Sequence, residues 1–134
     1  MVNALYPAAK EAFLNSAIDM DTDDIRAILV DLADYTYSAS HDFLDDVASA
    51  ARVAVSATLT SPTIALGVFD TADFVFTSVS GDPSEAIILY RHTGGSDAAR
   101  RLIAYYDTSI GGIPVTPNGQ NINVTINGSG WFSL

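Results

Sequence analysis

The feature that most constrains this chain is a series of short apolar runs, each ended by a turn signal, from Arg52 to Leu134. Breaks such as Ser61-Pro62, Asp70-Thr71-Ala72-Asp73 and Ser80-Gly81-Asp82-Pro83-Ser84 follow one another at intervals of about 8–12 residues. The runs are short for helices and rich in β-branched and aromatic residues, which favour strands. About seven to nine strands with this spacing predict a mainly β, antiparallel β-sandwich or jelly-roll-like domain.

Residues 86–90 and 102–107 are apolar on both faces, which predicts central strands. The other predicted strands alternate apolar and polar residues or end at turns, and they cover 52–60, 63–69, 74–79, 122–126 and 131–134. The last two of these segments are separated by Asn127-Gly128-Ser129-Gly130, so we predict that they form a hairpin with a long loop.

The first third of the chain has a mixed pattern. Pro7 suits a first helical turn, and the apolar positions that follow predict a short helix over residues 7–16. Residues 25–32 read as a buried strand, and residues 40–51 as a helix-like or irregular segment. We therefore predict one domain over residues 1–134, with a mixed region at 1–50 and a strand-rich body at 52–134.

Composition excludes several classes of function. Sixteen acidic and six basic residues give a net charge of −10, which argues against nucleic-acid binding and against an anionic membrane surface. No run approaches the roughly 20 apolar residues of a membrane span, and residues 1–7 lack a signal-peptide pattern. The absence of cysteine excludes disulfides and thiolate chemistry. Only 16% of the residues are charged, which suits a surface permanently covered by partners, although many compact monomers share this composition.

The acidic run from Asp19 to Asp24 is the strongest candidate for a metal site, because its spacing imitates the start of a calcium loop. An EF-hand needs Gly at its sixth position and Glu at its twelfth, where this chain has Asp24 and Val30. We therefore interpret the run as a solvated bend before a strand and predict no metal.

Candidate catalytic groups are sparse. His41 precedes Asp45 and Asp46, but helical spacing explains this grouping as a surface ion pair or cap. No serine lies in a nucleophile-elbow pattern, and no glycine pair begins a phosphate-binding loop. A glycosidase pair lacks support, because the two glutamates, Glu11 and Glu85, have no aromatic-rich surroundings. We predict no enzyme, no catalytic residue and no cofactor.

Several segments carry a resemblance to a known family. These segments are residues 3–14, 25–30, 31–47, 67–73, 102–107 and 114–119. The first begins with Asn-Ala-Leu-Tyr-Pro, and residues 67–73 read Gly-Val-Phe-Asp-Thr-Ala-Asp. Together they resemble a family of small structural proteins of tailed-bacteriophage virions, and the likeness covers nearly the whole chain. Members of this family have no catalytic residues that can be transferred to the chain.

The resemblance implies a location in the virion, on the capsid surface or in the tail. A cement (decoration) protein would bind the major capsid protein and copies of itself, and would be oligomeric in the assembled particle. A small tail or tail-fibre (adsorption) protein, with neighbouring tail proteins as partners, is the alternative, and a carbohydrate-acting enzyme is the third. We predict partner contacts from residues 1–13 and 35–47, through the apolar side chains of Leu5, Tyr6, Phe13, Tyr35, Tyr37 and Phe43.

Overall fold

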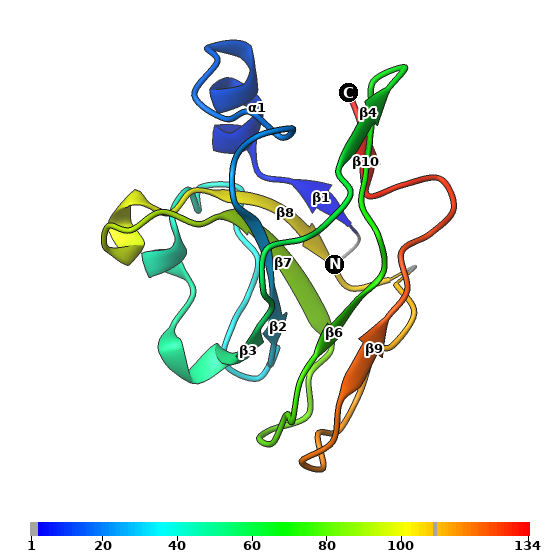
Figure 1. Ribbon diagram of the computed structural model, residues 1–134. Coiled ribbons are helices and arrows are strands. Elements are labelled where there is room, and N and C mark those ends of the chain that lie inside the picture. Colours follow the sequence, from blue (N-terminus) through cyan, green and yellow to red (C-terminus); the bar gives the residue numbers. More distant parts are fainter. Residues whose placement is uncertain (1–2, 109) are drawn as a thin grey trace.

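The centre of the fold is a five-stranded antiparallel sheet with the strand order β1-β8-β7-β2-β3 (Figure 1). The computed structural model describes residues 3–108 and 110–134. The five strands are β1 (Ala4–Leu5), β2 (Ile25–Val30), β3 (Arg52–Val55), β7 (Ala86–Arg91) and β8 (Leu102–Tyr106). The two predicted central strands thus lie side by side, and β2 is hydrogen-bonded to the other edge of β7.

Both faces of this sheet are covered, which explains why its central strands are apolar throughout. Successive strand residues point to opposite faces. On β8, Tyr105 packs against Tyr37 at a ring-centroid distance of 5.3 Å, whereas Tyr106 packs against Trp131 at 5.2 Å. The chain segment after β2 therefore covers one face, and the strands of the second half of the chain cover the other.

Two small sheets form the second layer: β10-β5-β4 and β6-β9. Their strands are β4 (Thr63–Ala65), β5 (Val68–Asp70), β6 (Phe74–Phe76), β9 (Ile122–Val124) and β10 (Phe132–Ser133). The prediction of one strand over residues 63–69 is wrong, because β4 and β5 form a hairpin. Leu66 and Gly67 make the turn, with φ angles of +52° and +80°. A β-carbon on Gly67 would lie 2.9 Å from the Leu134 carbonyl oxygen.

The predicted closing hairpin is also wrong. β9 pairs with β6, and β10 pairs with β5, so residues 125–131 carry the chain from one small sheet to the other. The anchor is Trp131, whose indole N–H donates to Thr71 Oγ1 at 2.8 Å and whose carbonyl accepts from the Tyr106 hydroxyl at 2.7 Å. These long-range bonds hold Trp131 in place, so that β10 pairs with β5 and not with β9. A local strand–turn–strand pattern gives no information about such distant partners.

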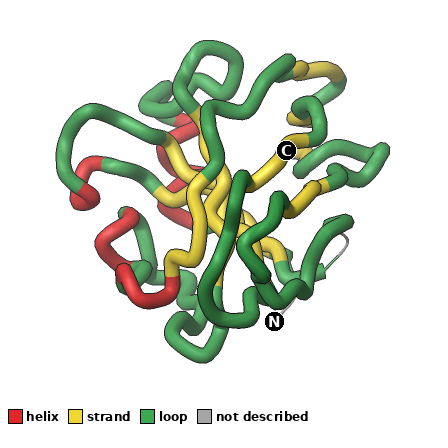
Figure 2. Tube along the Cα trace, turned by 60° about the horizontal axis from the view of Figure 1, so that its bottom comes forward, coloured by secondary structure: helices red, strands yellow, loops and turns green. Residues whose placement is uncertain are grey.

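Helical structure is limited and lies on one side of the molecule (Figure 2). The helix α1 (Pro7–Leu14) confirms the predicted N-terminal helix and buries Ala9 and Ala12. The predicted helix-like segment at 40–51 contains two 3₁₀ turns, η1 (Leu44–Asp46) and η2 (Ser49–Ala51), and a third, η3 (Asp97–Ala99), precedes β8. No described helix is long and apolar enough to cross a membrane.

The fold class is therefore mainly β and antiparallel, with 33% strand, 13% helix and an α-helix near the N-terminus. Sheets of five, three and two strands do not by themselves identify a jelly roll, so that finer assignment stays a prediction. The N-terminal third does not stand apart, because β1 and β2 belong to the same sheet as β7 and β8.

Candidate functional site

A buried tyrosine cluster holds three of the residues predicted to contact a partner. The Tyr6 and Tyr35 hydroxyls are 2.8 Å apart, and the Tyr35 hydroxyl lies 2.8 Å from Nδ1 of His41. The rings of Tyr6 and Tyr37 pack at a centroid distance of 5.1 Å. The structure buries Tyr6 and Tyr35 completely or nearly so. Contrary to the prediction, these two side chains bind the N-terminal segment to residues 35–41 and are not available to a partner.

Burial also changes the acidity of this cluster. Desolvation raises the pKa of Tyr35 from its ordinary value of 10 to about 12. The pKa of Tyr6 is raised further, again mainly because of burial, and its hydrogen bond to Tyr35 adds to the effect. Tyr6 and Tyr35 therefore stay protonated far above neutral pH, which keeps the hydrogen bond between their hydroxyls intact.

These shifts predict how stability depends on pH. A pKa that is higher in the folded state means that stability is complete below the unfolded pKa of about 10 and falls as the pH rises toward 12 and beyond. We expect the urea midpoint to decrease above pH 10, and to decrease less steeply in Tyr35→Phe. Equal slopes for the two proteins, measured by circular dichroism, would contradict this assignment.

The other predicted contact residues are partly exposed, so their role stays a prediction. Phe43 lies beneath the Arg101 guanidinium, whose central carbon is 4.5 Å from the ring centroid. Tyr37 belongs to the tyrosine cluster. Leu5 and Phe13 line a hollow beside α1. The proposed contact segment at residues 1–13 is partly structural, because β1 and α1 lie within it; its residues 1–2 are outside the described residues.

The acidic run before β2 is occupied by internal bonds. The Asp19 carboxylate accepts from the Asp21 N–H, and Asp23 accepts from the Asp19 N–H. Asp23 also pairs with Arg91, and Asp24 with Arg26, both at 2.9 Å. The hydrogen bond from the Asp21 N–H is the main cause that lowers the pKa of Asp19, so its carboxylate is ionised at neutral pH. The run is a hydrogen-bonded bend that precedes the strand.

Two other groups of carboxylates bring their oxygens within 4.8 Å of one another and could offer ligands to a hard cation. They are Asp31 with Asp34 and Asp82, and Asp42 with Asp45 and Asp46. In each group one carboxylate already accepts a backbone N–H: Asp31 from Ala33, and Asp46 from Asp42. Exposed acidic groups of this kind are common without an ion.

The histidines are held by tyrosines. His41 bonds Tyr35 through Nδ1, and not Asp45 as the helical spacing suggested. His92 Nδ1 lies 3.2 Å from the Tyr90 hydroxyl, and burial lowers the pKa of His92. Both imidazole rings therefore place Nδ1 within hydrogen-bond distance of a tyrosine hydroxyl.

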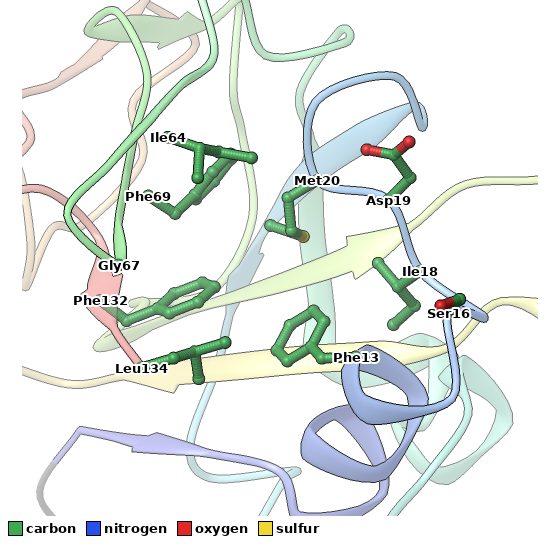
Figure 3. Close-up of a pocket in the computed structure, with 10 residues that line it drawn as sticks. All are labelled: Phe13, Ser16, Ile18, Asp19, Met20, Ile64, Gly67, Phe69, Phe132 and Leu134. Atoms are coloured by element: carbon green, nitrogen blue, oxygen red, sulfur yellow. The ribbon is translucent and has the colours of Figure 1, made fainter.

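An apolar groove of about 380 Å³ lies between α1 and the β4–β5 hairpin (Figure 3). Phe13, Ile18 and Met20 form one wall, and Ile64, Phe69 and Phe132 form the other (Figure 3). A second hollow of the same size adjoins it at Phe13 and Leu134.

Exposed apolar side chains gather around this groove, and we call them the apolar end: Leu14, Ile64, Leu66 and Leu134. Their exposed fractions are 89%, 55%, 102% and 73%. The sequence prediction missed the apolar end because it placed residues 63–69 in one strand. The Leu66-Gly67 pair was the available signal, since glycine favours the positive φ of a tight hairpin turn.

Comparison with known proteins adds no family. No protein-family model matches the chain, and no curated protein matches its sequence.

Proposed function

We propose that this chain is a structural protein of a tailed-phage virion, and specifically a cement protein that braces the shell of the major capsid protein. The observation that carries the proposal is the apolar end. Four aliphatic side chains project there beside an apolar groove, on a chain with 49% hydrophobic and only 16% charged residues. Grouped apolar surface of this kind is typical of protein–protein interaction sites and ligand-binding grooves, and supports a surface that a neighbouring protein covers.

The arrangement of charge supports attachment through that end. Four of the five arginines, Arg26, Arg52, Arg91 and Arg100, are held in ion pairs with Asp23, Asp24 or Asp97. None of these residues lines the apolar groove. A partner can therefore cover the groove without desolvating an arginine ion pair, which is the costly step in burying charge.

The resemblance of residues 3–14, 31–47 and 102–107 to small tailed-phage structural proteins supports the choice of a virion. A cement protein binds its shell through many copies, each with a modest interface. The partners in this proposal are the major capsid protein and neighbouring copies of the chain, and no enzymatic activity is part of it.

The experiment is to image particles that carry a labelled copy of the chain, and to measure the heat stability of shells with and without it. We expect the label to lie over the capsid. We also expect shells to become less stable to heat when the chain is removed. Label confined to the tail would replace the cement role with the tail or adsorption role. Absence from purified particles would overturn the proposal.

Attachment should depend on the apolar end. We expect Leu66→Asp to lower the occupancy of stripped shells at least tenfold in an add-back experiment, because it places a carboxylate in the covered surface. Val75→Asp, at a residue of β6 that is 40% exposed and outside the groove, is the matched control and should bind as the unchanged chain does. An equal loss of occupancy in both variants would show that the added negative charge, and not its position in the apolar end, weakens attachment.

A further inference from the structure

The small sheet β10-β5-β4 carries an apolar row that stops at its last strand. Phe132 pairs with Phe69, and Phe69 pairs with Ile64, so the three side chains cross the sheet in one line. The rings of Phe132 and Phe69 are 5.6 Å apart, and Phe69 is 3% exposed. Ile64 is 55% exposed, because no described strand lies beyond it. One more strand would complete the row.

The backbone of β4 is oriented to receive such a strand. In an antiparallel ladder, the N–H and C=O of each residue point together to one side, and the side alternates along the strand. The Phe69 carbonyl accepts from the Trp131 N–H at 2.8 Å, so Phe69 directs its backbone groups toward β10. Ile64, directly opposite Phe69, therefore directs its N–H and C=O to the free edge of β4.

Charge selects the kind of chain that fits there. Asp19 lines the groove, Asp21 lies two residues further along the chain, and both side chains are exposed. Of the nearby bases, Arg91 is already paired with Asp23 at 2.9 Å, and Lys10 lines the adjoining hollow. The whole chain carries a net charge of −10, so a second copy is repelled at this edge, whereas a basic segment is attracted.

We infer that the free edge of β4 binds an extended segment of a basic partner protein, in which apolar residues alternate with lysine or arginine. The segment adds a fourth strand to β10-β5-β4, bonds the outward N–H and C=O of Ile64, and places an apolar side chain beside Ile64 over the groove. Its basic residues lie near Asp19 and Asp21. This inference deepens the proposed function and rests on it only for the claim that the partner is a virion protein.

The test uses the isolated chain and two synthetic nine-residue peptides, one of alternating valine and lysine and one of alternating valine and glutamate. Nuclear magnetic resonance of the ¹⁵N-labelled chain maps the contact, and titration gives the affinity. We expect the lysine peptide to shift the amide signals of Ile64, Leu66 and Asp19, and to weaken as salt is raised. The glutamate peptide should bind at least tenfold more weakly.

Two variants separate the backbone from the side chain. Ile64→Pro removes the outward N–H but no bond to β5, and proline is tolerated at such edge positions, so the chain should keep its fold and lose binding at least tenfold. Ile64→Val keeps the N–H and should bind within about twofold of the unchanged chain. Amide spectra of both variants verify the fold.

Three outcomes would overturn the inference: no shift at Ile64, equal binding of both peptides, or full binding by Ile64→Pro. Sedimentation could also detect dimers of the unchanged chain. If Ile64→Pro abolished those dimers, the inference would be overturned in favour of a second copy at the β4 edge. Because no particle is involved, peptide binding can succeed even where the virion proposal fails. The virion proposal can likewise survive the loss of peptide binding.

Discussion

Replacing Trp131 with alanine should lower the free energy of unfolding by about 3–5 kcal/mol. The side chain is 4% exposed and packs between Tyr106 of the central sheet and Phe74 of β6, at ring-centroid distances of 5.2 and 6.1 Å. Its indole N–H also donates to Thr71. The substitution leaves a cavity where the two layers meet and removes that hydrogen bond.

Trp131→Phe is the control for the ring. It keeps an aromatic side chain in the cavity and loses the N–H, so its cost should be smaller, about 1–2 kcal/mol. Urea unfolding followed by far-ultraviolet circular dichroism compares the variants, because Trp131 is the chain's single tryptophan and fluorescence would be lost with it. A loss below 1 kcal/mol in Trp131→Ala would show that the residue does not join the layers.

Replacing Gly112 with alanine should lower the free energy of unfolding by about 3 kcal/mol or more. Gly112 has a φ of +107°, and a β-carbon there would collide with the backbone carbonyl oxygen of Asn123 in β9. The neighbouring Gly111 forms an antiparallel bridge with Thr125, so the loop cannot move away without losing backbone hydrogen bonds. The variant combines backbone strain with a steric clash.

Gly119→Ala is the matched control. Gly119 also has a positive φ, of +87°, but nothing lies within 4 Å of the position of its β-carbon. It should therefore lose only the strain energy, about 1–2 kcal/mol. The difference between the variants, measured by urea unfolding, isolates the collision with β9. Equal losses would show that the loop relaxes around the added methyl group.

The strands that could be predicted from the sequence are those that the pattern of neighbouring residues is enough to specify. Residues 86–90 and 102–106 are buried on both faces, and an apolar run of that length is most simply a central strand in a mainly β chain. The short helix after Pro7 was also readable, because proline at a first turn and the spacing of Ala9 and Ala12 are properties of neighbouring residues.

The predictions that were wrong concern strands whose partners are distant in the sequence, and strands joined by a very tight turn. The alternation in residues 122–126 and 131–134 suited a hairpin, but Trp131 is bound to Thr71 and Tyr106, far away in the chain. Tyr6 and Tyr35 looked like contact residues because they lie outside the regular strand pattern. Their hydroxyls meet across 29 residues of sequence, which no local pattern records.

The sequence by itself determined the mainly β class, the central strands, the acidic character and the short N-terminal helix, since these follow from composition and from the spacing of near neighbours. Tertiary structure alone decided which strands pair, which aromatic side chains are buried, and that Ile64 ends an open row beside the groove. The physical reason is that hydrogen-bond partners and burial depend on residues brought together from distant parts of the chain. A strand's own residues specify its two faces, but not the neighbour at its edge.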